Sequence, residues 1–152
     1  MKILKKIGIA LAVFVLIYIV LAFIAPAHCH VERTTIINSD AKTAFTNVNT
    51  LKTWKQWSYW DNIDKVSMWD SFSGPESGLG AKHWWKSPND SVGQGTLTIS
   101  KVEENKLVET ELYFEGMGTS IGGWKFADTT GGTKVTTYMD MDIPFLGRPF
   151  ML

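Results

Sequence analysis

Residues 96–115 read TLTISKVEENKLVETELYFE, and this stretch decides the fold. In its second half, apolar and threonine side chains alternate with glutamates. This period of two residues is typical of a β-strand with one buried and one solvated face. Glu104-Asn105 favours a tight turn between two such strands, Thr96–Glu103 and Lys106–Glu115. The stretch therefore predicts an antiparallel β-hairpin.

The same pattern continues on both sides of this hairpin. Short runs rich in Gly and Pro separate the period-two segments between residues 66 and 142. Four more strands are expected in this region, at Val66–Phe72, Ala81–Ser87, Gly123–Thr129 and Thr133–Asp142. Six consecutive strands joined by short turns predict an antiparallel meander.

One further strand and two helices are expected before the meander. His30–Asn38 is rich in β-branched residues and favours a strand. Ser39 and Asp40 are good helix N-caps, and the apolar residues from Ala41 to Val48 follow the spacing i, i+3, i+4, i+7 of an amphipathic helix. Thr50 can cap a second, short helix that is expected to contain Leu51, Trp54 and Trp57. This order of elements predicts an α+β fold with a strongly curved sheet.

An uncharged apolar run, IGIALAVFVLIYIVLAFIA, occupies Ile7–Ala25. Nineteen helical residues span about 28 Å, close to the roughly 30 Å of a bilayer core. Lys2, Lys5 and Lys6 precede the run, which favours a cytoplasmic N-terminus, and Pro26 ends the helix. The sequence thus predicts a membrane anchor over residues 1–27, with the domain of residues 28–152 on the extracytoplasmic side.

The sequence leaves two alternatives to this anchor. Ala25-Pro26-Ala27 loosely resembles the cleavage site of a signal peptide, but the apolar region of such peptides usually has about 7–15 residues. A lipoprotein linkage through Cys29 is less favoured, because His28 stands where a small residue is expected. A cleaved signal peptide would also carry the domain across the membrane.

Charge and motif content exclude several classes of function. Of 15 Lys+Arg and 15 Asp+Glu, three lysines precede the apolar run, so the rest of the chain carries 12 and 15 and a net charge of −3. Such a domain lacks the basic surface of a nucleic-acid-binding protein. His28-Cys29-His30 is the only cluster of soft ligands, and three adjacent residues rarely bind one ion. The sequence predicts no metal, no cofactor and no disulfide.

The order of these elements and several of their motifs resemble the START-like (SRPBCC) superfamily, which includes polyketide cyclases and Bet v 1-type proteins. The resemblance runs from Val31 to about Gly147 and includes bacterial members with a membrane anchor. The matching segments are VERTTIIN at Val31–Asn38, the W-x-x-W-S-x-W element at Trp54–Trp60, the loop Ser73–Gly80, Trp85, and the final strand from Gly132. The resemblance implies a helix-grip fold, in which a curved sheet surrounds a long C-terminal helix.

The sequence departs from the family at its C-terminal end. Family members continue past the last strand into the gripped helix, whereas this sequence ends at Pro149-Phe150-Met151-Leu152. We therefore expect a domain that is C-terminally truncated relative to the family. The apolar inner face of its sheet would then lack a cover, and a large exposed apolar patch commonly marks a binding site.

The function predicted first is the binding of an apolar small molecule or lipid in the concavity of the sheet. The residues expected to line the site alternate inward along their strands, with one at the mouth: His83, Trp85, Leu112, Phe114, Trp124, Phe126, Met139 and Trp57. An alternative is a cyclase- or dehydratase-like enzyme, for which His83 is the one candidate general base. No carboxylate shares its face in sequence, so a core histidine is favoured over a catalytic one. A second alternative is a protein-interaction or stress-response domain.

Overall fold

The computed structural model describes residues 2–152 and divides them into two compact units. Residues 30–140 form one unit, which we call the sheet domain. The chain before and after these residues forms the other, which we call the terminal unit.

The terminal unit is built on one long apolar helix. Helix α1 spans Lys2–Ile24 and is long and apolar enough to cross a membrane, although a signal sequence would have the same properties. The 3-10 helix η3, Phe145–Met151, packs against its second half. The rings of Phe23 and Phe145 meet edge to face at 5.0 Å, and the Tyr18 hydroxyl donates a hydrogen bond to the carbonyl of Leu146.

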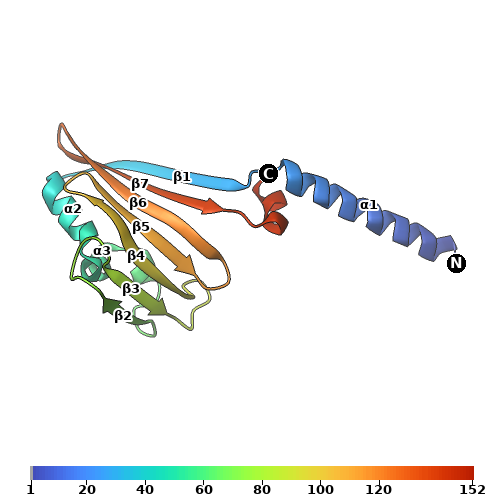
Figure 1. Ribbon diagram of the computed structural model, residues 1–152, viewed down its shortest axis with the longest axis horizontal. Coiled ribbons are helices and arrows are strands. Elements are labelled where there is room, and N and C mark those ends of the chain that lie inside the picture. The colour runs from blue at the N-terminus through green and yellow to red at the C-terminus, as the bar shows by residue number, and fades with distance from the viewer. Residues whose placement is uncertain (1) are drawn as a thin grey trace. The chain divides into compact units, whose positions relative to one another are not determined.

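The sheet domain contains a curved antiparallel sheet of seven strands in the order β1-β7-β6-β5-β4-β3-β2. Figure 1 shows β1 beside β7, so the first and last strands of the chain are neighbours. The predicted α+β helix-grip fold is confirmed. The strands are β1 His28–Ile37, β2 Trp69–Ser73, β3 Lys82–Lys86, β4 Gln94–Glu103, β5 Leu107–Phe114, β6 Gly118–Thr129 and β7 Gly132–Asp142.

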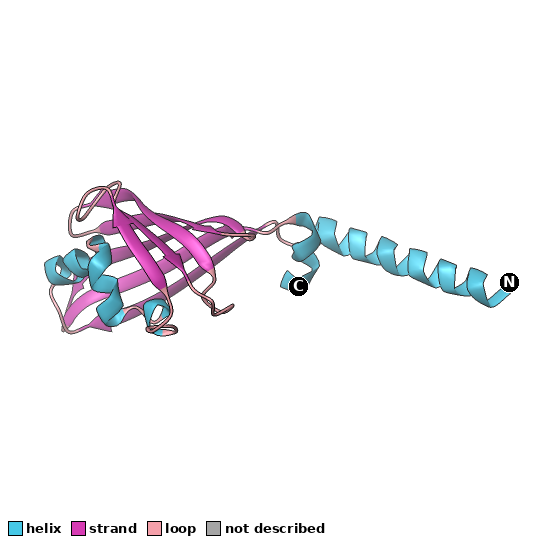
Figure 2. Ribbon diagram, turned by 90° about the horizontal axis from the view of Figure 1, so that it is seen from below, coloured by secondary structure: helices cyan, strands magenta, loops and turns pink. Residues whose placement is uncertain are grey.

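Short helices cover part of one face of this sheet (Figure 2). They are α2 Ala41–Asn49, η1 Leu51–Thr53, α3 Trp54–Trp57 and η2 Trp60–Asn62. The expected cap of α2 is present, because the Asp40 carboxylate accepts a hydrogen bond from the backbone N–H of Thr43 at 2.8 Å. Helix α2 buries Ala41, Ala44, Phe45 and Val48, the residues that its apolar spacing predicts.

The core lies between these helices and strands β3 to β6. Ile99 and Val108 are completely buried at its centre, and Trp85 and Leu97 pack around them. Strand β1, in contrast, buries almost none of its side chains. The side chains of the sheet are therefore well buried under the helices and much more exposed at β1 and β7.

Two strands begin three or more residues away from their expected starts. Val66 and Ser67 lie in a turn rather than in the strand that begins at Trp69, because the Asp64 carboxylate accepts hydrogen bonds from the backbone and hydroxyl of Ser67. Such local bonds compete with strand pairing. Strand β6 begins at Gly118, five residues before the expected start at Gly123.

Candidate ligand-binding site

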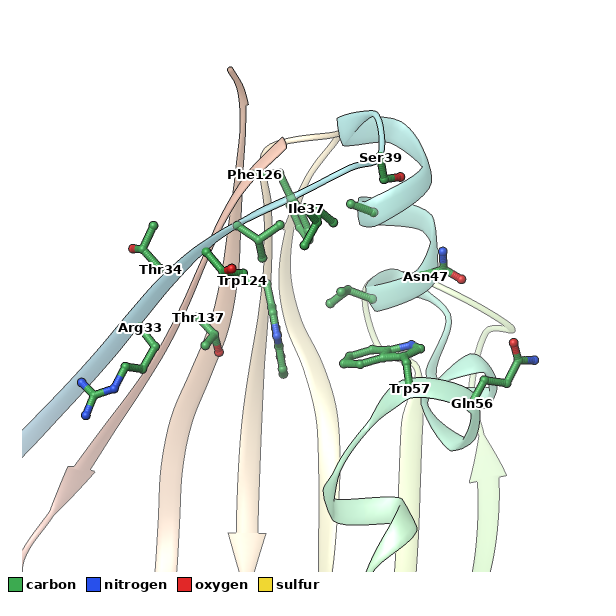
Figure 3. A pocket seen from close by; sticks show the side chains of 14 residues that line it. Arg33, Thr34, Ile37, Ser39, Asn47, Gln56, Trp57, Trp124, Phe126 and Thr137 are labelled. Atoms are coloured by element: carbon green, nitrogen blue, oxygen red, sulfur yellow. The ribbon is translucent and has the colours of Figure 1, made fainter. Parts of the chain in front are cut away.

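A pocket of about 740 Å³ opens between the β1–β7–β6 end of the sheet and helices α2 and α3. In Figure 3, strand side chains form one wall and helix side chains the other. The pocket lies on the inner face of the sheet, and most of its wall is apolar. Its lining residues are Arg33, Thr34, Thr35, Ile37, Ser39, Ala44, Asn47, Val48, Gln56, Trp57, Trp124, Phe126, Val135 and Thr137.

One end of the pocket lies where the chain passes from β1 into α2 (Figure 3). There the buried hydroxyl of Thr133 donates a hydrogen bond to the carbonyl of Ser39 at 2.7 Å, which ties the β1–α2 connection to β7. The ring of Phe126 meets that of Phe45 edge to face at 6.0 Å. These contacts hold the helix at a fixed distance from the sheet, and the pocket occupies the space left beside them.

Tryptophans form the two facing walls in the middle of the pocket. Trp57 of α3 and Trp124 of β6 are these walls, and Trp54 is buried beside them, where its indole N–H donates to the carbonyl of Val48 at 2.9 Å. It packs edge to face on Trp124 of the sheet at 4.8 Å and lies 5.3 Å from Trp57 on its own helix. Trp54 therefore positions both neighbours, and their remaining surfaces face the pocket.

The expected ligand-binding residues fall into two groups. Trp57, Trp124 and Phe126 line the pocket together. The others face the same side of the sheet but lie outside the pocket: His83, Trp85 and Leu112 are buried in the core, and Phe114 and Met139 pack at its edge. Their role in binding remains a prediction.

His83 is enclosed by other side chains. Its ring stacks on Phe72 at 4.6 Å with an interplanar angle of 9°, and its Nε2 atom is buried with no hydrogen-bond partner among residues 2–152. Burial lowers the pKa of His83. Nearby Asp61 and Asp70 act against this shift, while Lys55 reinforces it. These features, a stacked ring, burial and a lowered pKa, are those of a histidine that packs in a protein core.

Several lining residues are absent from the sequence-based expectation. Strand β1 contributes Arg33, Thr35 and Ile37, and the helices contribute Asn47, Val48 and Gln56. Alternation along β1 indicates which of its side chains lie on the inner face of the sheet, and the apolar spacing of α2 indicates which side of the helix faces the sheet. Nothing in the pattern, however, shows that the space between these two elements stays unfilled.

The two histidines that flank Cys29 pair with carboxylates of β7. His28 Nδ1 lies 3.2 Å from Asp142 Oδ1, and His30 Nδ1 lies 2.6 Å from Asp140 Oδ1. No group of three or more His, Cys, Asp or Glu side chains within residues 2–152 is placed to hold a metal ion.

Comparisons with known proteins bear on the fold. No protein-family model matches the sequence, and no curated protein matches it. Solved structures do match. Ginseng major latex-like protein 151 from Panax ginseng has a TM-score of 0.56 at 18% identity, over 77% of this chain and 80% of its own. Ara h 8.0201 has a TM-score of 0.54 at 12% identity, over 77% and 81%.

A bacterial structure shows the same likeness. A protein of unknown function from Staphylococcus aureus has a TM-score of 0.59 at 12% identity, over 77% of this chain and 71% of its own. This chain has the Bet v 1-like helix-grip fold. At such low identities the likeness extends to the fold and not to a particular activity.

Proposed function

We propose that this chain is a membrane-anchored binding protein whose ligand is an apolar small molecule or lipid. The pocket beside α2 and α3 carries this proposal. Its volume of about 740 Å³ lies within the range of roughly 300–1,000 Å³ that small-molecule sites occupy. Its walls are mainly apolar, so burial of hydrocarbon would supply most of the affinity.

The α1 helix supports the membrane part of the proposal. The lysines at its start favour a cytoplasmic N-terminus, and we therefore propose that the sheet domain lies on the extracytoplasmic side. A membrane-impermeant maleimide tests this orientation, because Cys29 is the single cysteine of the chain and is partly exposed. Labelling of intact cells is expected. Labelling only after cell lysis would contradict the orientation, and a mature chain beginning near Ala27 would contradict the uncleaved anchor.

A titration with matched tryptophan variants tests the binding site. The full chain is placed in phosphatidylcholine nanodiscs and titrated with a single-chain fluorescent lipid. Trp57→Ala removes one pocket wall and is expected to weaken binding about tenfold, since a ring loses roughly 1–2 kcal/mol of apolar contact. Trp84→Ala is the control, because Trp84 is exposed to a similar extent (37% against 42%) but lies outside the pocket lining.

The two variants separate the outcomes clearly. Equal weakening by Trp57→Ala and Trp84→Ala would contradict a site in this pocket. Absence of any bound apolar molecule, both in the titration and in mass spectrometry of the purified full chain, would contradict the proposed function itself.

A further inference from the structure

Arg33 is the one charged residue that lines the pocket. The other lining residues are apolar or carry neutral hydroxyl or amide groups. Figure 3 shows the Arg33 side chain on β1, at the rim away from α2 and α3. The pocket thus has an apolar interior between the tryptophans and a positive charge at its edge.

The positive charge of Arg33 is not neutralised within the described part of the chain. Its one hydrogen bond runs from Nη1 to the backbone carbonyl of Glu32 at 2.9 Å, and no ion pair with residues 2–152 involves it. The Glu32 carboxylate lies on the opposite side of β1, where its Oε2 atom is 3.9 Å from His30 Nε2. Several donors of the guanidinium therefore remain available for an acceptor.

A second donor lies next to Arg33 on the same face. The hydroxyls of Thr34 and Thr136 are 2.9 Å apart across β1 and β7. In antiparallel strands, this contact makes Arg33 and Thr137 neighbours on the inner side, and both line the pocket. The Thr137 hydroxyl has no hydrogen-bond partner among the described residues. A guanidinium beside a free hydroxyl can bind an oxyanion with two kinds of donor.

We propose that the pocket binds single-chain amphiphiles with an anionic head group, with the carboxylate or phosphate at Arg33 and Thr137 and the alkyl chain between Trp57 and Trp124. This inference rests on the proposed function and narrows its ligand class. Fatty acids and alkyl phosphates share the required chemistry. Neutral lipids of the same length would gain the apolar contacts but not the contact with the guanidinium.

Three probes of equal chain length test the head-group preference: decanoate, decyl phosphate and 1-decanol. Each is titrated at pH 7.4 against the full chain in phosphatidylcholine nanodiscs, with tryptophan fluorescence as the readout. An exposed charge-assisted contact is worth up to about 1 kcal/mol, or about fivefold in affinity. At least one anionic probe should therefore bind about fivefold more tightly than 1-decanol, and this advantage should shrink as salt is raised.

Variants of Arg33 connect the preference to the residue. Arg33→Gln should remove the advantage of the anionic probe and leave 1-decanol binding unchanged, whereas Arg33→Lys should keep part of it. Lys82→Gln is the matched control, because Lys82 is an exposed cation of β3 outside the pocket. This variant is expected to leave the affinities for all three probes unchanged.

The outcomes distinguish this inference from the proposed function. Equal affinity for all three probes, or an anionic preference that survives Arg33→Gln, would overturn the head-group assignment and leave the apolar site standing. Failure of every probe to bind would count against the apolar site as well. Tighter binding of decanoate than of decyl phosphate would identify a carboxylate as the preferred head group, and the reverse result a phosphate.

Discussion

The buried imidazole of His83 should make the stability of the sheet domain depend on pH. Burial lowers the pKa of His83 from its usual value of 6.5, so the folded protein holds this side chain neutral at pH values where the unfolded chain binds a proton. Stability is therefore fully present above about pH 6.5. It is lost as the pH falls below this value, until the folded-state pKa is reached.

The size of this effect follows from one proton. The free energy of unfolding changes by at most about 1.4 kcal/mol per pH unit while the unfolded state carries the extra proton. The perturbation is His83→Phe, which keeps a ring stacked on Phe72 and cannot be protonated. It also removes the unpartnered Nε2 atom, a buried polar group of a kind that costs about 1–3 kcal/mol.

Urea unfolding of the full chain in neutral detergent micelles, followed by tryptophan fluorescence from pH 7.5 to 4.5, measures the difference. The gap between His83→Phe and wild type should move in favour of the variant as the pH falls, by up to about 1.4 kcal/mol per unit. Other titrating groups cancel in this comparison, because both proteins contain them. A gap that stays constant across this range would refute the reasoning, since His83 would then take up its proton equally in the folded and unfolded states.

Two further perturbations test local features of the sheet domain. Gly132→Ala should destabilise the fold by about 2–4 kcal/mol in urea unfolding. Gly132 has φ of 139°, and a Cβ atom there would overlap the carbonyl oxygen of Ile37, whereas Gly131→Ala, at φ of 90° with open space around it, should cost only about 1 kcal/mol. Equal costs would show that backbone conformation alone matters. Asp64→Asn should lower the thermal midpoint at neutral pH, because hydrogen bonds from Ser87 and Ser67 lower the pKa of Asp64 to about 2. The difference from wild type should close as the pH falls from about 4 to 2, and a pH-independent difference would contradict this account.

The strands of the meander could be predicted because one face of each strand is buried and the other is solvated, so that apolar and polar residues alternate along the sequence. The hairpin of β4 and β5 falls within one or two residues of its expected bounds, and Asn105 in its turn adopts the positive φ of 57° that Asn tolerates. The expected start of β6 at Gly123 is five residues too late, because the alternation before it is interrupted by two glycines. Gly122 and Gly123 instead lie inside the strand, where the side chains of Leu112 and Tyr138 occupy the space above them.

The pocket was harder to predict than the face on which it lies. Alternation shows that Trp85 and Trp124 point to the same side of the sheet, but Trp85 is buried under the helices while Trp124 borders the pocket. The difference depends on where α2 and α3 pack, which is a property of tertiary structure. Arg33 carries no sequence signal of a site, since a charged residue on an edge strand is ordinarily a solvated one.

Strand β1 is both part of the pocket and the strand that follows the apolar helix α1. It forms one wall of the pocket through Arg33 and Thr35, and its first residue follows α1 after only three linking residues. Its side chains are almost all exposed, so it is held mainly by its ladder with β7 and by cross-strand contacts such as that of Thr34 with Thr136. Because β1 is the first element of the sheet that follows α1 along the chain, a pulling force on α1 would reach the sheet through β1. Under the proposed anchoring of α1 in a membrane, tension on the helix would therefore act first on a strand that forms a wall of the pocket.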